Sequence, residues 1–307
     1  MAMRPILTSR VGFLSIMCGE PASGDEVDDI QLSGIIQSGR FHCPTTGSIA
    51  MEYDFQRIAS MLSPSGKFRA ERIFFFDEVD STNAWMLRQQ EVDGLCCIAN
   101  HQVAGKGSRG KTWTDAPGGS ILMSMGWEVD VDRCCGVSLV AGLAVIGALK
   151  ETGVGGIRLK WPNDILADGR KLGGILVEKS GSKLVVGLGL NVNLQQPSMH
   201  GVDQPWTDLS SIGAGCDGDV LVSRLLRNMG DMITDCVTGG FAGYAESWNA
   251  ADAFAGLPVQ VLSGREAISG IERGVDRTGA LRIESDAGIR TVHAGDVSLR
   301  RMEPFRE

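Results

Sequence analysis

The sequence predicts an α+β fold with a mixed, largely antiparallel sheet, followed by a small β-barrel. Strand-like segments between residues 157 and 193 are separated by the short turns Asp168–Gly169 and Ser180–Gly181–Ser182. Such short turns join antiparallel neighbours, because a parallel pair needs a crossover of about a dozen residues or more. From Leu257 onward, short alternating runs lie between glycine-containing turns, which is the pattern of a small barrel. A doubly wound nucleotide-binding fold is therefore disfavoured.

The other elements follow from hydrophobic periodicity and helix-capping residues. Ser81, Thr82 and Asn83 supply N-cap side chains directly before an amphipathic segment, so a helix is expected to begin there. The apolar stretch Val137–Leu149 is shorter than the roughly 18 residues that a membrane-spanning helix needs, so it is expected to be a buried helix. Further helices are expected at residues 53–62, 221–236 and 241–249, and further strands at residues 73–76, 96–99 and 120–127.

Composition indicates a globular protein and limits the kinds of partner that its whole surface can attract. The 307 residues carry 29 Lys and Arg against 37 Asp and Glu, a formal net charge of −8, which argues against attraction of the whole surface to nucleic acid or anionic membrane. The eight cysteines include two adjacent pairs and no C-x-x-C, so reduced thiols in the cytoplasm are expected. Residues 1–50 lack sustained periodicity and are expected to be a poorly ordered leader; the alternative is a transit peptide, which would direct the protein to an organelle.

A glycine-rich basic loop is the strongest local signal for chemistry. It consists of Gly105, Lys106, Gly107, Ser108, Arg109, Gly110 and Lys111, and Trp113 follows it. Three glycines let backbone N–H groups point into one concavity and the cations add positive charge, so the loop suits phosphates. It matches neither a Walker A motif nor a dinucleotide-binding motif in its βαβ setting. The alternative is a mobile surface loop with solvated cations.

A second basic cluster is expected on a hairpin. The segments that flank the Asp168–Gly169 turn are neighbours, so Lys160 and Lys171 are expected to converge with Asp164 on one surface. Residues 150–183 contain seven Lys and Arg against four Asp and Glu, although the whole chain is acidic. The alternative is an ordinary hairpin with surface lysines.

Five motifs carry a family resemblance. They are STN at residues 81–83, GKGSRGKTW at 105–113, KWPND at 160–164, RKLGGILVE at 170–178 and GLGLNVN at 187–193. With the small β-domain that follows, they make residues 53–301 closely resemble the biotin protein ligases. The resemblance implies a catalytic domain built on the mixed sheet of lipoate ligases and class II aminoacyl-tRNA synthetases, and an SH3-like C-terminal domain. The expected boundaries are a leader at residues 1–50, a catalytic domain at 51–252 and the SH3-like domain at 253–307.

The resemblance also implies a reaction. Biotin protein ligases use ATP and Mg²⁺ to convert biotin into biotinyl-5′-AMP, and then transfer biotin to a lysine of a carrier protein. By resemblance, Lys171 contacts the biotin carboxylate and the α-phosphate, Lys160 orients the second step, and Asp164 supports them or binds magnesium. The residues expected around ATP and the adenylate are Gly105, Lys106, Gly107, Ser108, Arg109, Gly110, Lys111, Trp113 and Asn191, with Arg109 also expected to be catalytic.

Polar side chains favour biotin over lipoate as the substrate. The ureido ring of biotin carries two N–H donors and a carbonyl, so its pocket needs buried polar partners, whereas a dithiolane needs only apolar walls. By family position these partners are Ser81, Thr82, Asn83 and Gln102, and Lys171 and Gly174 complete the biotin site. The alternative reading of residues 81–83 is a helix N-cap without a ligand.

Ser108 departs from the family pattern, which usually has arginine there. We expect weaker closure over the adenylate and easier escape of activated biotin, unless the neighbouring Arg109 takes over that role.

The expected partner is the biotin carboxyl carrier protein or domain of a biotin-dependent carboxylase. No membrane is expected, and a homodimer remains open. No DNA is expected either, because residues 1–50 are acidic and offer no pair of amphipathic helices joined by a short turn. Two other functions stay open: a lipoate or octanoate protein ligase-type transferase, and a non-catalytic biotin-binding regulatory module.

Overall fold

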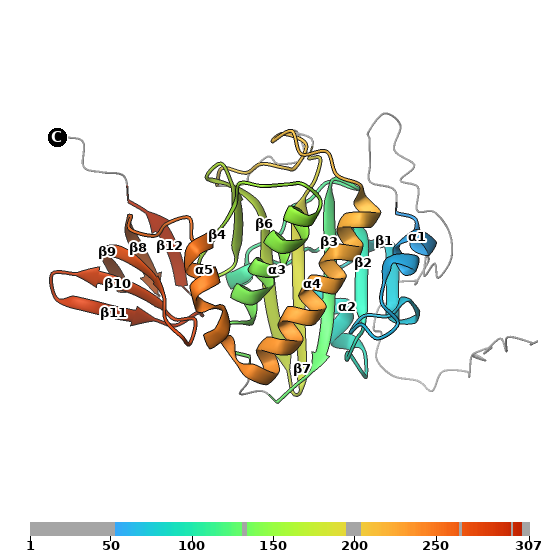
Figure 1. Cartoon of the computed structure of the whole chain (residues 1–307), viewed down its shortest axis with the longest axis horizontal. Coiled ribbons are helices and arrows are strands. Elements are labelled where there is room, and N and C mark those ends of the chain that lie inside the picture. Colours follow the sequence, from blue (N-terminus) through green and yellow to red (C-terminus); the bar gives the residue numbers. More distant parts are fainter. Residues whose placement is uncertain (1–52, 131–133, 195–203, 264–265, 296, 303–307) are drawn as a thin grey trace, which may run out of the picture. The chain divides into compact units, whose positions relative to one another are not determined.

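The structure is a computed structural model that describes residues 53–130, 134–194, 204–263, 266–295 and 297–302. The expectations for residues 1–50, namely the leader and its alternatives, lie outside the described residues. The described part contains a seven-stranded sheet and a five-stranded sheet (Figure 1).

The large sheet is mixed and mostly antiparallel, as predicted. Its strands are β1 (Ile73–Val79), β2 (Cys96–Gln102), β3 (Ser120–Glu128), β4 (Ile157–Lys160), β5 (Asp164–Ala167), β6 (Arg170–Ser180) and β7 (Lys183–Asn191), in the order β1-β2-β3-β7-β6-β5-β4. Only the pair β1 and β2 is parallel among these neighbours. The two short turns do produce the antiparallel pairs β5–β6 and β6–β7, so neighbouring motifs of the chain become neighbours in space.

The predicted helices are present, with slightly different ends. They are α1 (Phe55–Met61), α2 (Thr82–Arg88), α3 (Val137–Glu151), α4 (Gly218–Gly239) and α5 (Ala245–Ala251), with short 3₁₀ turns at Ala70–Arg72, Ser108–Gly110 and Phe241–Tyr244. Ser81 is the N-cap of α2 and accepts a hydrogen bond from the backbone N–H of Ala84. No helix within the described residues is both long and apolar enough to cross a bilayer.

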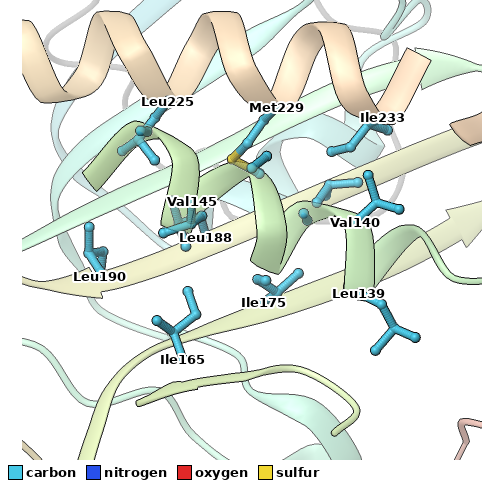
Figure 2. Packing of buried hydrophobic residues seen from close by; sticks show 14 of the residues in the cluster. Leu139, Val140, Val145, Ile165, Ile175, Leu188, Leu190, Leu225, Met229 and Ile233 are labelled. Atoms are coloured by element: carbon cyan, nitrogen blue, oxygen red, sulfur yellow. The ribbon is translucent and has the colours of Figure 1, made fainter. Parts of the chain in front are cut away.

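Helix α3 lies between α4 and the large sheet, which explains why it is apolar on all sides. Figure 2 shows Leu225, Met229 and Ile233 of α4 pointing toward α3, while Ile175 and Leu188 of the sheet lie on its other side. Helix α4 has one buried and one exposed face because only one side meets this core.

On the opposite face of the sheet, a second cluster joins α2 to β2 and β7 through Trp85, Met86, Cys97 and Val185. The six cysteines in the described part of the chain are free thiols, as expected.

The C-terminal strands form a separate antiparallel sheet, consistent with the expected SH3-like unit. They are β8 (Pro258–Ser263), β9 (Glu266–Val275), β10 (Leu281–Ser285), β11 (Gly288–Val292) and β12 (Val297–Arg301), in the order β11-β10-β9-β8-β12. The sequence pattern suggested one run from residue 289 to 300, but that run divides into β11 and β12, which lie at opposite edges of the sheet. A period-2 pattern does not reveal such a break, because both halves alternate in the same way.

Two buried carboxyl groups join the end of α5 to the C-terminal sheet. Asp252 is 6% exposed and Glu272 of β9 is fully buried. Burial raises the pKa of both groups, and the charge of the neighbouring Asp252 raises that of Glu272 further. Glu272 is therefore favoured in its protonated form at neutral pH, since two neighbouring buried carboxylates repel each other.

The raised pKa of Glu272 predicts that the free energy of unfolding depends on pH. The pKa of Glu272 is higher in the folded chain than in the unfolded chain, so its contribution to stability is complete below the unfolded pKa and is lost as pH rises through the folded one. One such group contributes a slope of at most about 1.4 kcal/mol per pH unit. Urea unfolding between mildly acidic and mildly basic pH should give a flatter profile for Glu272→Gln than for the native chain. Equal pH dependence of stability in the two chains would show that Asp252 and Glu272 have ordinary pKa values in the folded protein.

Candidate functional site

Two adjoining cavities lie among the ends of the central strands. The smaller has a volume of about 50 Å³ and the larger a volume of about 850 Å³. They share Gly107, Ser108, Trp113, Asn163 and Lys171 in their walls. The glycine-rich loop and the basic hairpin, which are far apart in the sequence, therefore face the same space.

The smaller cavity brings together the polar residues that were expected to bind biotin. Its walls include Ser81, Thr82, Asn83, Gln102, Lys171 and Gly174, and also Lys106, Gly187 and Gly189. Gln102 Oε1 accepts a hydrogen bond from the backbone N–H of Thr82 at 2.7 Å, which joins the start of α2 to the end of β2. Ser81, Thr82 and Asn83 are all buried. The N-cap and the cavity wall are thus built from the same residues.

Ser124 of β3 belongs to this polar cluster, although the sequence analysis did not single it out. Its hydroxyl lies 2.7 Å from Thr82 Oγ1 and 2.6 Å from Asn83 Oδ1, and its side chain is fully buried. A serine in the middle of a mostly apolar strand is the only sequence signal that marks it.

The glycine-rich loop is folded back on itself. The backbone N–H of Trp113 donates to Gly105 O at 2.9 Å, and that of Gly107 donates to Lys111 O at 2.7 Å. A Cβ at Gly105 would lie 2.7 Å from the carbonyl oxygen of Trp113, so this close approach requires glycine. Arg109 has φ 61° and ψ 37°, the left-handed region that non-glycine residues rarely adopt. Lys106, Arg109 and Lys111 are exposed; Lys106 lines the smaller cavity, whereas Arg109 and Lys111 line the larger.

Lys160, Asp164 and Lys171 form a charge cluster in the wall of the larger cavity, and their predicted convergence is confirmed. Lys160 Nζ lies 2.9 Å from Asp164 Oδ2, and Lys171 Nζ lies 2.7 Å from Asp164 Oδ1. Burial acts to raise the pKa of Asp164, but the attraction of Lys171 and Lys160 outweighs it, and the pKa lies below its ordinary value. The cluster therefore carries two ammonium groups against one carboxylate, a net positive charge that suits an anion.

Trp113 forms a wall common to both cavities. A Cβ at Gly189 would lie 2.5 Å from Trp113 Cζ2, so the ring packs directly on the glycine backbone of β7. Lys171 Nζ lies 5.5 Å from the centre of the ring, within the range of a cation–π interaction. The indole N–H is buried without a hydrogen-bond partner in the described part of the chain.

Asn191 lies at the end of β7, where it lines the larger cavity. Its side-chain N–H donates to Thr207 O at 3.0 Å, which leaves Oδ1 buried without a partner among the described residues. A buried unsatisfied acceptor costs free energy, so this oxygen is suited to a ligand donor.

Several residues of the larger cavity were not foreseen. Trp206 reaches it because the backbone of Lys171 pairs with residues 205 and 207, at 2.9 and 2.8 Å. Arg300 and Arg301 of β12 also line it. No local pattern in the sequence connects these residues to the basic hairpin, since their positions depend on tertiary contacts.

A mixed sheet with a polar pocket beside a cationic cavity is the arrangement of an enzyme that binds a small polar molecule next to an anionic one. Residues 75–194 match the biotin/lipoate A/B protein ligase family, and residues 255–300 match the biotin protein ligase C terminal domain.

Relatives agree with these matches. The bifunctional ligase/repressor BirA of Escherichia coli (strain K12) is 35% identical over 234 residues, which is 73% of this chain and 73% of that protein. The biotin–[acetyl-CoA-carboxylase] ligase of Mycobacterium tuberculosis is 36% identical over 237 residues, covering 72% of this chain and 86% of that one. A structure of the biotin protein ligase from Aquifex aeolicus in complex with biotin and ATP superposes with a TM-score of 0.68 at 27% identity, covering 76% of this chain and all of the other. The chain therefore belongs to the biotin protein ligase family, and the predicted family and fold class are confirmed.

Proposed function

We propose that this biotin protein ligase binds the ureido ring of biotin in the smaller cavity and ATP in the larger one. The chain is an ATP-dependent enzyme that activates biotin as biotinyl-5′-AMP and transfers it to a lysine of a carboxylase carrier domain. The observation that carries the assignment of the cavities is the position of Lys171, whose side chain lines both. A group at that junction is placed to contact the biotin carboxylate and the α-phosphate at once.

The charge cluster supports both steps of the reaction. In the first step a carboxylate oxygen of biotin attacks the α-phosphorus of ATP, a P–O bond forms, and pyrophosphate leaves. Lys171 is proposed to stabilise the charge that develops on the α-phosphate oxygens, while Asp164 holds its ammonium group in place at 2.7 Å. In the second step the carrier lysine attacks the acyl carbon and AMP leaves, and Lys160 is proposed to orient that amine.

Mg²⁺ is proposed to enter with ATP. Both oxygens of Asp164 are engaged by lysines, and the described residues contain no group of three or more His, Cys, Asp or Glu that would hold a metal. These residues do not fit a site that the protein fills by itself. Mg²⁺ commonly binds through substrate phosphates and only one or two carboxylates, so no step of this mechanism is assigned to a metal held by Asp164.

The carrier domain is proposed to dock on the free edge of β6. Residues 170–174 of this strand pair with β5, but residues 176–178 pair with β7 alone among the described strands. An unpaired edge accepts an added strand through main-chain hydrogen bonds. This edge begins directly after Gly174 and Ile175, which line the smaller cavity. The homodimer, the cytoplasmic location and the lack of DNA binding stay predictions.

A transfer assay tests the proposed function. The chain is incubated with MgATP, biotin and a biotin carboxyl carrier domain, and the mass of the carrier is followed. Biotin attachment that requires ATP is expected. Pyrophosphate exchange that depends on lipoate or octanoate but not on biotin would instead indicate the related transferase, and binding of biotin without exchange or transfer would indicate a regulatory module.

Ser108 predicts poor retention of the adenylate. Its short side chain lines both cavities, where an arginine would add a charged donor. One charge-assisted hydrogen bond contributes roughly 1.5 kcal/mol or more, so Ser108→Arg should slow release of biotinyl-5′-AMP by about tenfold. Release is measured by trapping the free adenylate, with the exposed Ser65→Arg as a control. Equal release rates for Ser108→Arg and the native chain would show that another residue, such as Arg109, already closes the site.

A further inference from the structure

We propose that Glu178 is a positioning residue that fixes the orientation of the Asn83 amide and thereby selects the ureido ring of biotin. Glu178 lies on β6 and is absent from the walls of both cavities, so it is placed to act on the ligand through Asn83. The inference rests on the proposed function, in which the smaller cavity binds the ureido ring. It explains in addition what fixes the pattern of hydrogen-bond donors and acceptors in that cavity.

Asn83 faces two acceptors on β6. Its Nδ2 donates to Glu178 Oε2 at 2.8 Å and to the backbone oxygen of Leu176 at 3.3 Å. A carboxylate and a carbonyl can only accept hydrogen bonds, so both require the nitrogen of the amide on this side. Asn83 is 3% exposed, which leaves little water to satisfy a reversed amide. Reversal would place Oδ1 against a carboxylate, with neither group able to donate.

Packing alone would not select this orientation. The backbone of Gly187 confines Asn83 tightly, because a Cβ there would lie only 3.0 Å from Asn83 Cγ. However, the oxygen and nitrogen of a carboxamide have nearly the same size. Steric confinement thus fixes the plane of the amide, and the two acceptors on β6, of which Glu178 is the charged one and the closer, decide which end faces this strand.

The orientation of the Asn83 amide determines the directions of the hydrogen bonds in the rest of the polar cluster, as far as Gln102. Because Asn83 Oδ1 only accepts, the single hydroxyl proton of Ser124, 2.6 Å away, points toward it. Thr82 Oγ1 in turn donates to Gln102 Oε1 at 3.1 Å. Since Gln102 Oε1 already accepts from the backbone of Thr82, the amide nitrogen of Gln102 is left as a donor for a ligand carbonyl.

Biotin presents one carbonyl and two N–H groups on its ureido ring, so a fixed set of donors and acceptors recognises it better than a set that can reverse. A site whose buried polar atoms are left unpaired discriminates strongly against the wrong ligand. Glu178 is therefore expected to affect ligands that contain a ureido ring and to leave simple fatty acids unaffected.

The test compares Glu178→Gln with Glu178→Asp and with Glu246→Gln, a control at an exposed position of α5. Glutamine keeps the size of the side chain, but its amide can pair with Asn83 in either orientation. Biotin-dependent pyrophosphate exchange should show a KM for biotin raised by about tenfold, with kcat at saturating biotin and KM for ATP within about twofold of the native values. The conservative change Glu178→Asp keeps the carboxylate and should recover part of the affinity. Inhibition by octanoate should be the same in all variants.

Two results would overturn the proposal. One is an unchanged KM for biotin in Glu178→Gln. The other is a parallel loss of biotin affinity, octanoate affinity and thermal stability, which would show that Glu178 only supports the fold. If the native chain shows no biotin-dependent exchange at all, the proposed function itself fails, and that outcome is distinct from either of these.

Discussion

Replacing Lys171 by alanine is expected to lower the rate of biotin adenylation by about 10²–10³-fold, because a preorganised donor aimed at developing charge is worth roughly 3–4 kcal/mol in the transition state. Lys171 is held on both sides: its backbone pairs with residues 205 and 207, and its ammonium group contacts Asp164. Such fixed positioning gives a larger effect than loss of a mobile surface lysine would. Biotin-dependent pyrophosphate exchange measures this step without the carrier.

Two further variants distinguish the effect of removing the Lys171 charge from a general effect of the substitution on folding. Lys171→Arg keeps a cation and should retain more activity than alanine, although its longer side chain does not reproduce the contact with Asp164. Lys150→Ala, at an exposed position near the end of α3, should leave exchange unchanged. In Lys171→Ala, Asp164 still contacts Lys160 at 2.9 Å, so its thermal stability should fall only slightly. An exchange rate within a few-fold of the native rate would remove Lys171 from the proposed mechanism.

Gly187→Ala is expected to weaken biotin binding by about 10–100-fold. The added Cβ would lie 3.0 Å from Asn83 Cγ and closer still to Oδ1, and the strand cannot retreat because Gly187 pairs with Ser124 on one side and Leu176 on the other. Overpacking of a tight site costs about 1–3 kcal/mol, and each 1.4 kcal/mol corresponds to tenfold in affinity. The expected change is therefore a higher KM for biotin, with Asn83 displaced from the cavity wall.

Gly155→Ala provides the matched control, because a Cβ at Gly155 meets no atom within 4 Å. It should leave KM for biotin and for ATP unchanged. Biotin titration by calorimetry would check the affinity directly. If Gly187→Ala binds biotin as the native chain does, then Asn83 has room to move and its position cannot matter for the ligand.

The basic hairpin was predictable because its residues are close in the chain. A tight turn forces its flanking strands to pair, so the neighbourhood of Lys160, Asp164 and Lys171 follows from sequence alone. The polar residues 81–83 were predictable through their N-cap pattern, but their contacts were not: Ser124 lies 41 and 42 positions away from Asn83 and Thr82. No local propensity encodes contacts of that kind.

The larger cavity was less predictable than the smaller one. Trp206, Arg300 and Arg301 come from segments without strong periodicity or from the C-terminal sheet. Their approach to the hairpin depends on how whole elements pack. The resemblance predicts the glycine loop and the charge cluster at one site, and both line the adjoining cavities, but no pattern in the sequence reveals that the C-terminal strands contribute to the walls.

The indole of Trp113 belongs to the walls of both cavities. Its ring packs directly on the backbone of Gly189. A molecule that moved this ring in one cavity would also change the wall of the other. Cooperativity between two ligands is the same whichever binds first, so any effect that a molecule in one cavity has on affinity in the other would be matched by an equal effect in the reverse direction.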